Sequence, residues 1–349
     1  MTLPVLIAAV IAALLPMRAR VLSVDDSALQ THGLVKYGSQ VLEVELLDGD
    51  RKGERFQATN VVRAQMELDK FFEPGDTITV AVPDDAAPGT MLVARDHWRL
   101  GWIAAGFGAF ALLLVVFGGW VGIRALASFA ISCVVIWKFV VPLALDGVNA
   151  TVVAFGATAL LTAAIMYLVG GFTRKATAAF LGSMLGVIAG LGLAHFFGSV
   201  LKINGATLPF VQTLVYSGIA ELDLADVFIA ATILASSGAM MDLAMDIAAG
   251  VSEVARHSPG LGFSALFMSG LRIGRATVGT MTTTLLLAYS GGYLTLLMVF
   301  HAQGTPPLDF LSSPIVAAEV VKTLVGSLSI VLVAPFTALA SAYLARCRR

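Results

Sequence analysis

Long uncharged segments constrain this chain more than any other feature of its sequence. Each contains the roughly 20 apolar residues that an α-helix needs to cross a bilayer. They cover residues 100–123, 125–145 (interrupted only by Lys138), 147–173, 176–201, 276–308 and 323–345. Hydrophobic residues make up 58% of the chain and charged residues 13%, about half the charged fraction of soluble domains, and mean hydropathy is +0.87. The sequence therefore predicts an α-helical polytopic membrane protein.

We expect about eight transmembrane helices. An apolar run supplies an N-terminal anchor helix within residues 1–19, favoured over a cleavable signal peptide because no small-residue cleavage site follows. The transmembrane bundle occupies residues 99–349, with spans near 100–120, 124–145, 149–170, 177–200, 224–250, 276–299 and 320–344. The run 207–220 contains Pro209 and Gly218 and is too short to cross, which favours a re-entrant or interfacial segment, with an amphipathic surface helix as the alternative.

Lysines and arginines indicate the orientation of these spans, because short cytoplasmic loops carry an excess of them. Eight spans with both termini in the cytoplasm place nine cations of the loops and the C-terminus inside and the loops near Asp146, Glu221 to Asp226 and Asp309 outside. Only Arg18 and Arg20 depart from this distribution. The cationic positions expected inside are Arg124, Arg174, Lys175, Arg256, Arg272, Arg275, Arg346, Arg348 and Arg349. The chain is thus expected to be a multi-pass protein of the cell membrane, with residues 20–98 extracytoplasmic.

Residues 20–98 have the pattern of a small β domain. Leu42, Val44 and Leu46 alternate with glutamates, and the ERFQATN segment that follows a charged turn is expected to return as a second strand. Later, Glu73-Pro74-Gly75-Asp76 has Pro and Gly in type II turn positions and leads into TITVAV. We expect a small all-β domain of OB type after the first helix.

Two aspartates in the predicted span 224–250 are the strongest indication of a functional site. A carboxylate near the bilayer centre costs roughly 2.5–3.5 kcal/mol on insertion scales, so Asp242 and Asp246 require a partner or a hydrated environment. Their spacing of four puts them on one helical stripe, which continues towards Glu253. Neighbouring methionines are a poor match to carboxylates as metal ligands, so no metal or cofactor is expected.

A second stripe follows in the next predicted span. Arg272 and Arg275 lie three residues apart, and Gly279 and nearby threonines, including Thr280 and Thr283, continue along the helix. Glycines at 270, 274 and 279 allow close approach of backbones. If the helix folds back beside the aspartate helix, the two stripes meet and line a transport pathway formed by Asp242, Asp246, Arg275, Thr280 and Thr283. The alternative is that Asp246 or Glu253 only pairs with Arg272 or Arg275 to neutralise charge.

Glu319 and Lys322 form another polar pair, near the start of the last predicted span. They are three residues apart and can form an ion pair on one helix. Structural charge pairing is the favoured interpretation for them.

Two sequence blocks, SSGAMMDLAMDIAAGVSEV and SGLRIGRATVGTMTTTLLLAYSGG, closely resemble the YibE/F family of multi-pass membrane proteins. The residues that carry the resemblance are Gly238, Ala239, Met241, Asp242, Ala244, Met245, Gly270, Ile273, Gly274, Arg275, Gly279, Thr280, Met281, Thr284 and Leu285. The likeness extends over the anchor helix, the β domain and the bundle. Family members often carry an aspartate directly after the arginine, whereas this chain has Ala276, which argues against a mechanism based on a local Arg–Asp pair. The resemblance implies a membrane topology and assigns no activity.

The sequence favours a permease or channel-like transporter of an unidentified small solute or ion. The β domain would gate the pathway or bind a ligand. The alternative is a non-transporting scaffold or accessory protein whose β domain binds an envelope or secretion partner. An enzyme is not expected, because the sequence lacks HExxH, GxxxxGK[ST] and GxSxG motifs. The expected partners are the lipid bilayer and a small solute or ion, with a second copy or an envelope protein left open, and the net charge of −1 argues against nucleic acid.

Overall fold

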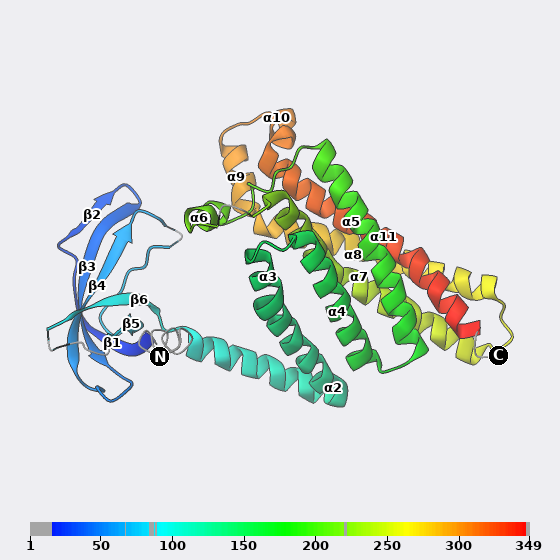
Figure 1. The fold of residues 1–349 in the computed structure, drawn as a ribbon, viewed down its shortest axis with the longest axis horizontal. Coiled ribbons are helices and arrows are strands. Elements are labelled where there is room, and N and C mark those ends of the chain that lie inside the picture. Colours follow the sequence, from blue (N-terminus) through cyan, green and yellow to red (C-terminus); the bar gives the residue numbers. More distant parts are fainter. Residues whose placement is uncertain (1–15, 67, 84–86, 88, 220–221, 347–349) are drawn as a thin grey trace. The chain divides into compact units, whose positions relative to one another are not determined.

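The structure, a computed structural model, describes residues 16–66, 68–83, 87, 89–219 and 222–346. It divides between Leu112 and Leu113 into two compact units, an N-terminal unit and a helical unit (Figure 1). Because the described residues begin at 16, most of the predicted anchor helix (residues 1–19) lies outside them. The first described strand already begins at Pro16, so residues 16–19, which were assigned to the anchor, belong to the β domain.

The N-terminal unit contains a closed barrel of β-strands. The strands are β1 (Pro16–Asp25), β2 (Leu29–His32), β3 (Val35–Leu46), β4 (Arg55–Arg63), β5 (Thr77–Ala81) and β6 (Met91–His97). β1 pairs with both β3 and β5, which closes the order β1-β3-β4-β6-β5-β1, while β2 forms a hairpin with β3. All of these pairs are antiparallel except β4 with β6. Each of the five strands in this closed order is paired on both sides, whereas β2 pairs only with β3 among the described residues.

Alternation of side chains places the barrel core as the sequence predicts. Leu42, Val44 and Leu46 are fully buried, and Ile78 and Val80 on β5 are buried on the same core. In the turn before β5, the N–H of residue 76 donates to the carbonyl of residue 73, and the glycine at 75 has φ +98°. This is the backbone conformation that a type II turn requires at its third residue.

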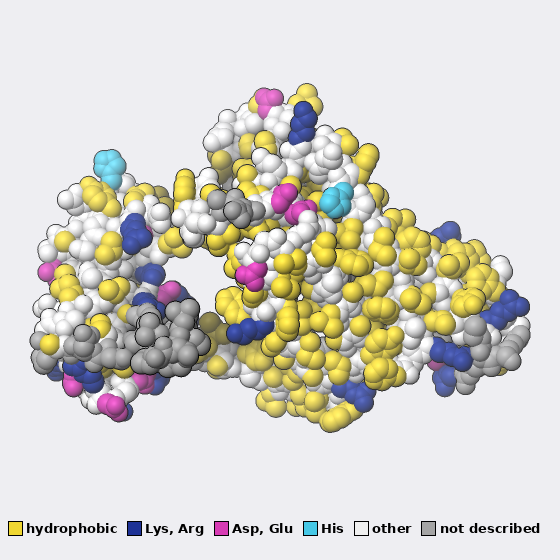
Figure 2. Space-filling view, viewed as in Figure 1, with side chains coloured by type: hydrophobic (Ala, Val, Ile, Leu, Met, Phe, Trp, Pro, Cys, Tyr) yellow, Lys and Arg dark blue, Asp and Glu magenta, His cyan; other side chains and the backbone are white. Residues whose placement is uncertain are grey.

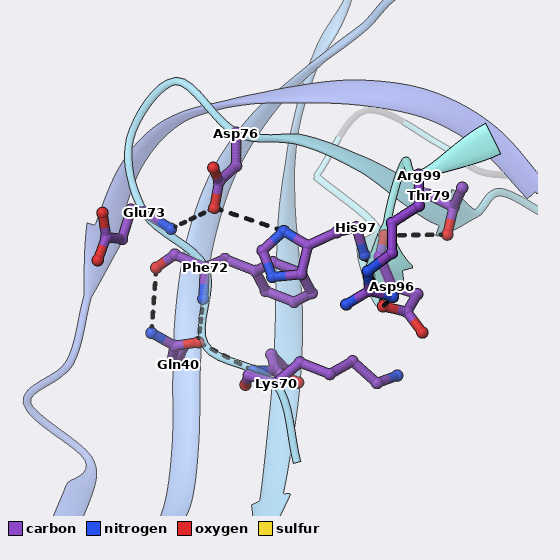
Figure 3. A network of polar contacts seen from close by, with 10 residues as sticks. Gln40, Lys70, Phe72, Glu73, Asp76, Thr79, Asp96, His97 and Arg99 are labelled. Carbon is purple, nitrogen blue, oxygen red and sulfur yellow. Dashed lines mark hydrogen bonds and ion pairs between the residues drawn. The ribbon is translucent and has the colours of Figure 1, made fainter. Parts of the chain in front are cut away.

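A buried amide pair fixes the connection between β4 and β5 (Figure 3). Asn60 Nδ2 donates to Gln40 Oε1 at 2.9 Å and to the Lys70 carbonyl at 2.6 Å. The Phe72 N–H donates to the same Gln40 oxygen at 3.1 Å, and Gln40 Nε2 donates back to the Phe72 carbonyl. These bonds satisfy buried polar groups that would otherwise be costly, and they hold the Phe72 ring in the core, 4.8 Å from the ring of His97.

The remaining elements are helical. They are α2 (Leu100–Val135), η1 (Ile136–Val140), α3 (Val141–Leu145), α4 (Ala150–Gly170), α5 (Arg174–Val200), α6 (Val211–Tyr216), α7 (Leu224–His257), α8 (Phe263–Gly292), α9 (Leu294–Ala302), α10 (Pro307–Ser312) and α11 (Pro314–Arg346). Among the described residues, five helical stretches are long and apolar enough to cross a membrane. A sixth is added if α8 and α9, which are bent by 65° at their junction, count as one span. The predicted number of eight is not confirmed.

The first of these stretches, Leu100–Leu145, is interrupted in its middle. A straight helix of 46 residues would be about 69 Å long, roughly twice the thickness of the hydrocarbon core. Gly119 has φ +53°, outside helical geometry, and a Cβ on Gly122 would overlap the carbonyl of Leu114. The chain thus turns back on itself at the boundary that the sequence predicts between the spans 100–120 and 124–145.

Small residues allow the helices of the bundle core to approach closely. Glycines of α5 face side chains of α11 in three successive layers, in which Gly182 meets Thr337, Gly186 meets Val333 and Gly190 meets Ser329. On α8, Gly270 and Gly274 meet α11 at Ala338 and Ala334, as expected from their spacing, but Gly279 has no neighbour within 4 Å. Such contacts are the usual basis of helix packing in membranes.

The segment 207–220 contains one short helix and no span. Its only regular element in the described part is α6, six residues long, preceded by Phe210 in the left-handed region. A helix of six residues is too short to cross a bilayer, and the re-entrant or interfacial position of the segment stays a prediction.

Candidate functional site

The face of the helical unit seen in Figure 2 is largely hydrophobic along its flank, and many charged side chains of the unit lie near its two ends. One end is formed where α4, α7 and α11 end and α5 and α8 begin, and the other where α4 and α7 begin. The first end carries Arg174, Lys175, Arg256 and Arg346, and the second carries Asp146, Asp223, Asp226 and Asp309, together with Lys202. This separation is what a bundle of antiparallel spans with basic loops on one side produces.

Asp242 and Asp246 lie on the outer stripe of α7. Both residues are exposed, whereas Leu243, Ala244 and Ile247 between and beside them are buried against the rest of the bundle. The spacing of four residues therefore keeps the two carboxylates together, as predicted, but on the face that points away from the core. Neither carboxylate has a hydrogen bond or ion pair to another described residue.

The acidic and basic stripes do not meet. Gly250 of α7 packs against the Ile273 side chain of α8, so Ile273 occupies the side of α8 that faces α7. Arg275 comes two residues later, about 200° further around the helix, and is directed away from α7. Arg272 is exposed and has no ion-pair partner among the described residues. Glu253, the other acid expected to pair with these arginines, instead contacts Arg256 on its own helix at 2.6 Å.

The threonines of α8 are satisfied within their own helix. Thr280 Oγ1 donates to the Thr277 carbonyl at 2.9 Å, and Thr283 Oγ1 donates to the Gly279 carbonyl at 3.0 Å. Both side chains are exposed on the helix surface. Such bonds to the preceding turn are the usual way for a hydroxyl to be accommodated in an apolar helix, so these residues do not by themselves require a polar pathway.

The predicted pairing of Glu319 with Lys322 is present and largely enclosed. Lys322 Nζ lies 2.6 Å from Glu319 Oε1, and the two side chains are only 10% and 15% exposed, respectively. The ammonium also lies 3.4 Å from the hydroxyl of Tyr293 and 5.5 Å from the centre of the Phe228 ring. It is also 5.6 Å from the centre of the Tyr293 ring. The cation is therefore surrounded by a carboxylate, a hydroxyl and two aromatic rings.

A cavity of about 310 Å³ opens beside this pair, at the bend between α8 and α9. Its polar lining comes from Tyr289, Ser290, Tyr293, Glu319 and Thr323, and its apolar lining from leucines, valines and a phenylalanine of α8 to α11. Two buried atoms, Glu319 Oε2 and the hydroxyl oxygen of Tyr289, have no hydrogen-bond partner among the described residues. Buried polar atoms normally have one, so the hydrogen-bonding capacity of these two atoms is left unused by the described residues.

The tyrosines of this cavity, Tyr289 and Tyr293, are candidate site residues that the sequence analysis did not identify. In the sequence, Tyr289 and Tyr293 resemble ordinary residues of an apolar span. In the structure they lie at the bend between α8 and α9 and line the cavity together with residues of α11. The available signal was the pair Gly291-Gly292 directly before Tyr293, since adjacent glycines inside an apolar helix often mark a break.

Comparison with known families gives one match. Residues 107–347 match the family described as YibE/F-like protein, and this match covers more than half of the chain. The matched region begins within α2 and contains the α7 stripe and the Glu319–Lys322 cavity, while the β barrel lies before it. No curated protein and no solved structure matches the chain.

Proposed function

This chain belongs to the YibE/F family, and from that premise we propose that it is a membrane permease for a small solute or ion. The observation that carries the proposal is the enclosed Glu319–Lys322 ion pair beside the bend between α8 and α9. It supplies charged and hydroxyl groups inside an otherwise apolar bundle, together with a cavity large enough for a small molecule.

The energetics of the pair favour a functional role. Each charge placed within the membrane costs roughly 2.5–3.5 kcal/mol on insertion scales. A buried pair that only neutralises itself is often replaceable by apolar residues with no loss of stability. Here Glu319 lines the cavity, and one of its carboxylate oxygens has no hydrogen-bond partner among the described residues. Interrupted helices beside such sites are typical of secondary transporters, in which backbone and side chains at the break bind the solute or coupling ion.

Asp242 and Asp246 form a second part of the proposal. They do not line the cavity, and no described residue neutralises them, so contact with lipid would be costly. We place a hydrated path along their side of α7, where Thr280 lies on the adjoining side of α8. Arg275 is directed away from α7 and is left out of this path, whereas the predicted role of Thr283 in it stays a prediction.

The β barrel is proposed to gate the permease or bind its solute on the outside. Its strand order and single parallel pair support an OB-type Greek-key barrel. We propose that both termini lie in the cytoplasm and residues 20–98 outside, because the basic end of the bundle then faces inward. Arg18, whose position disfavoured this orientation, lies in β1 and is neutralised by Asp48 at 2.6 Å.

Flux through proteoliposomes tests the proposal. The double variant Glu319→Gln with Lys322→Met removes both charges and leaves no unpaired ion. We expect it to assemble and to lose flux of the transported species in a panel of protons, inorganic ions and small solutes. The matched control is Glu253→Gln with Arg256→Gln, which removes an ion pair of the same spacing and the same 2.6 Å distance from an exposed position. The control should retain wild-type flux.

Wild-type flux in the Glu319/Lys322 double variant would show that the pair is structural only. Absence of flux for every probe in the wild type would favour the alternative function, a scaffold whose barrel binds an envelope or secretion partner. Water accessibility also distinguishes a permease from a scaffold. In a permease, Asp242 should be accessible to water, whereas in a scaffold protein should cover that residue.

A further inference from the structure

We propose that the basic end of the helical unit contains a binding site for a phosphate group. A cavity of about 520 Å³ lies there between the start of α5 and the ends of α7 and α11. Its lining is Thr173, Arg174, Lys175, Ala178, Ala248, Ser252, Ala255, Ser341, Leu344 and Ala345. This volume accommodates a phosphate together with an organic substituent. The site is distinct from the Glu319–Lys322 cavity, which lies near the opposite end of α11.

The charged lining of this cavity is entirely cationic. Arg174 and Lys175 both contribute to the wall, and neither side chain has a hydrogen bond or ion pair to another described residue. No aspartate or glutamate lines the cavity. The acid nearest in sequence to its lining, Glu253, is already paired with Arg256. The electrostatic character of the cavity therefore selects an anion.

Backbone donors point to the same chemistry. α5 is a helix of 27 residues that begins at Arg174, directly at the cavity. The hydroxyl of its N-cap, Thr173, accepts the N–H of Ala176 at 3.3 Å. The amides of Arg174 and Lys175, the first two of the helix, have no partner among the described residues. Free amides and the positive end of the helix dipole form an established arrangement for phosphate binding.

Ser341 supplies an independent indication. The residue is only 5% exposed, lines the cavity, and its hydroxyl oxygen has no hydrogen-bond partner among the described residues. Lysines and arginines gather at membrane edges for topological reasons alone, but topology does not explain a buried hydroxyl that lacks a partner. A phosphate oxygen held by Arg174 and Lys175 would accept a hydrogen bond from the Ser341 hydroxyl and so satisfy it.

The phosphate can come from a phospholipid headgroup or from a soluble phosphate compound, because the cavity lies at the end of the bundle. Full-length protein in neutral detergent distinguishes these sources. One arm measures thermal stabilisation by inorganic phosphate at constant ionic strength, and the other measures retention of phosphatidylglycerol by native mass spectrometry. Arg174→Gln with Lys175→Gln should weaken binding at least about tenfold, and Ser341→Ala about threefold to tenfold.

The charge-matched control is Arg124→Gln with Lys138→Gln, which removes two cations that do not line the cavity. It should bind like the wild type. Stabilisation by inorganic phosphate would support the site and assign it to soluble phosphate compounds. Retention of the lipid alone would support it and assign it to headgroups. The proposal is overturned if neither probe binds, if the control weakens binding as much as the Arg174/Lys175 variant, or if Ser341→Ala, which folds with all charges in place, binds like the wild type.

Discussion

Gly182 of α5 lies so close to Thr337 of α11 that a Cβ at position 182 would be only 2.7 Å from the Thr337 Cα. Because that atom belongs to the backbone of a packed helix, it cannot move aside as a flexible side chain can. One and two turns along α5, a Cβ at Gly186 or Gly190 would overlap side-chain atoms of α11, Val333 Cγ2 at 2.1 Å and Ser329 Oγ at 2.5 Å. The close approach of α5 and α11 therefore depends on glycine at these positions.

Gly182→Leu is expected to destabilise the bundle by about 1–3 kcal/mol or more through overpacking. Gly192→Leu is the matched control, since position 192 lies on the same helix with nothing within 4 Å. Thermal unfolding of both variants in detergent measures the difference. Equal unfolding temperatures for the two variants would contradict the packing of α5 on α11.

The Glu319–Lys322 pair should show the signature of an enclosed ion pair. Glu319→Gln or Lys322→Met alone leaves one charge without its partner and should cost about 3–5 kcal/mol. The double variant should recover most of that loss. Unfolding temperatures of the two single variants and the double variant form the required cycle. Additive losses in the double variant would show that the two side chains do not interact.

Local features of this fold could be predicted from the sequence because they depend on neighbouring residues. The alternation at 42, 44 and 46 and the turn at 73–76 place the barrel core. The Gly118-Gly119 pair marks the turn between two apolar segments. In each case the information lies within a few residues, so side-chain periodicity or backbone freedom decides the outcome.

The candidate site could not be predicted in the same way, because it depends on how helices are rotated about their axes. The insertion of Ile273 against Gly250 fixes the rotation of α8 and turns Arg275 away from the aspartates. The spacing of Arg272 and Arg275 shows that they share a face but not which neighbour that face meets. Likewise, the bend at Tyr293, a tertiary feature, brings Tyr293 to Lys322.

Stability of the barrel should depend on pH through Asp48. The side-chain hydrogen bond from Arg18 and the attraction of its charge hold the pKa of Asp48 below its ordinary value. A lowered folded-state pKa adds stability that is complete above the unfolded-state pKa of about 3.9 and is lost as the pH falls through the lower, folded-state value. Asp48→Asn should therefore be less stable than the wild type at pH 7, and the two should converge in strong acid.

Urea unfolding of a soluble polypeptide of residues 16–98, followed by the fluorescence of Trp98, measures this dependence. Arg18 lies 5.3 Å from the centre of the Trp98 ring, so the fluorescent probe is next to the ion pair whose loss is being tested. We expect a modest stability of a few kcal/mol for a domain of this size. A wild-type-like pH profile in Asp48→Asn would exclude the ion pair as its cause, and a random-coil spectrum at pH 7 would show that the barrel depends on the helical unit.

The orientation of the chain is testable by labelling single cysteines with an impermeant reagent. In a Cys133→Ala, Cys347→Ser background, Ser39→Cys in β3 should react in intact cells. Ser264→Cys at the start of α8 should react only after permeabilisation, because the basic end of the bundle is expected inside. The reverse pattern would invert the topology and place the cavity of Arg174 and Lys175 outside the cytoplasm.

Asp242 offers the sharpest test, because the structure gives it no partner to lose. Asp242→Asn should change the free energy of unfolding by no more than about 0.5 kcal/mol, in contrast to Glu319→Gln. If Asp242 faces a hydrated path, the same variant should assemble normally and lose cation or proton movement. Unfolding temperature in detergent and flux in proteoliposomes are measured on one preparation. If Asp242→Asn unfolds at a much lower temperature and neutralising Arg272 or Arg275 restores it, an acid–arginine contact exists in the membrane and the role of Asp242 is structural.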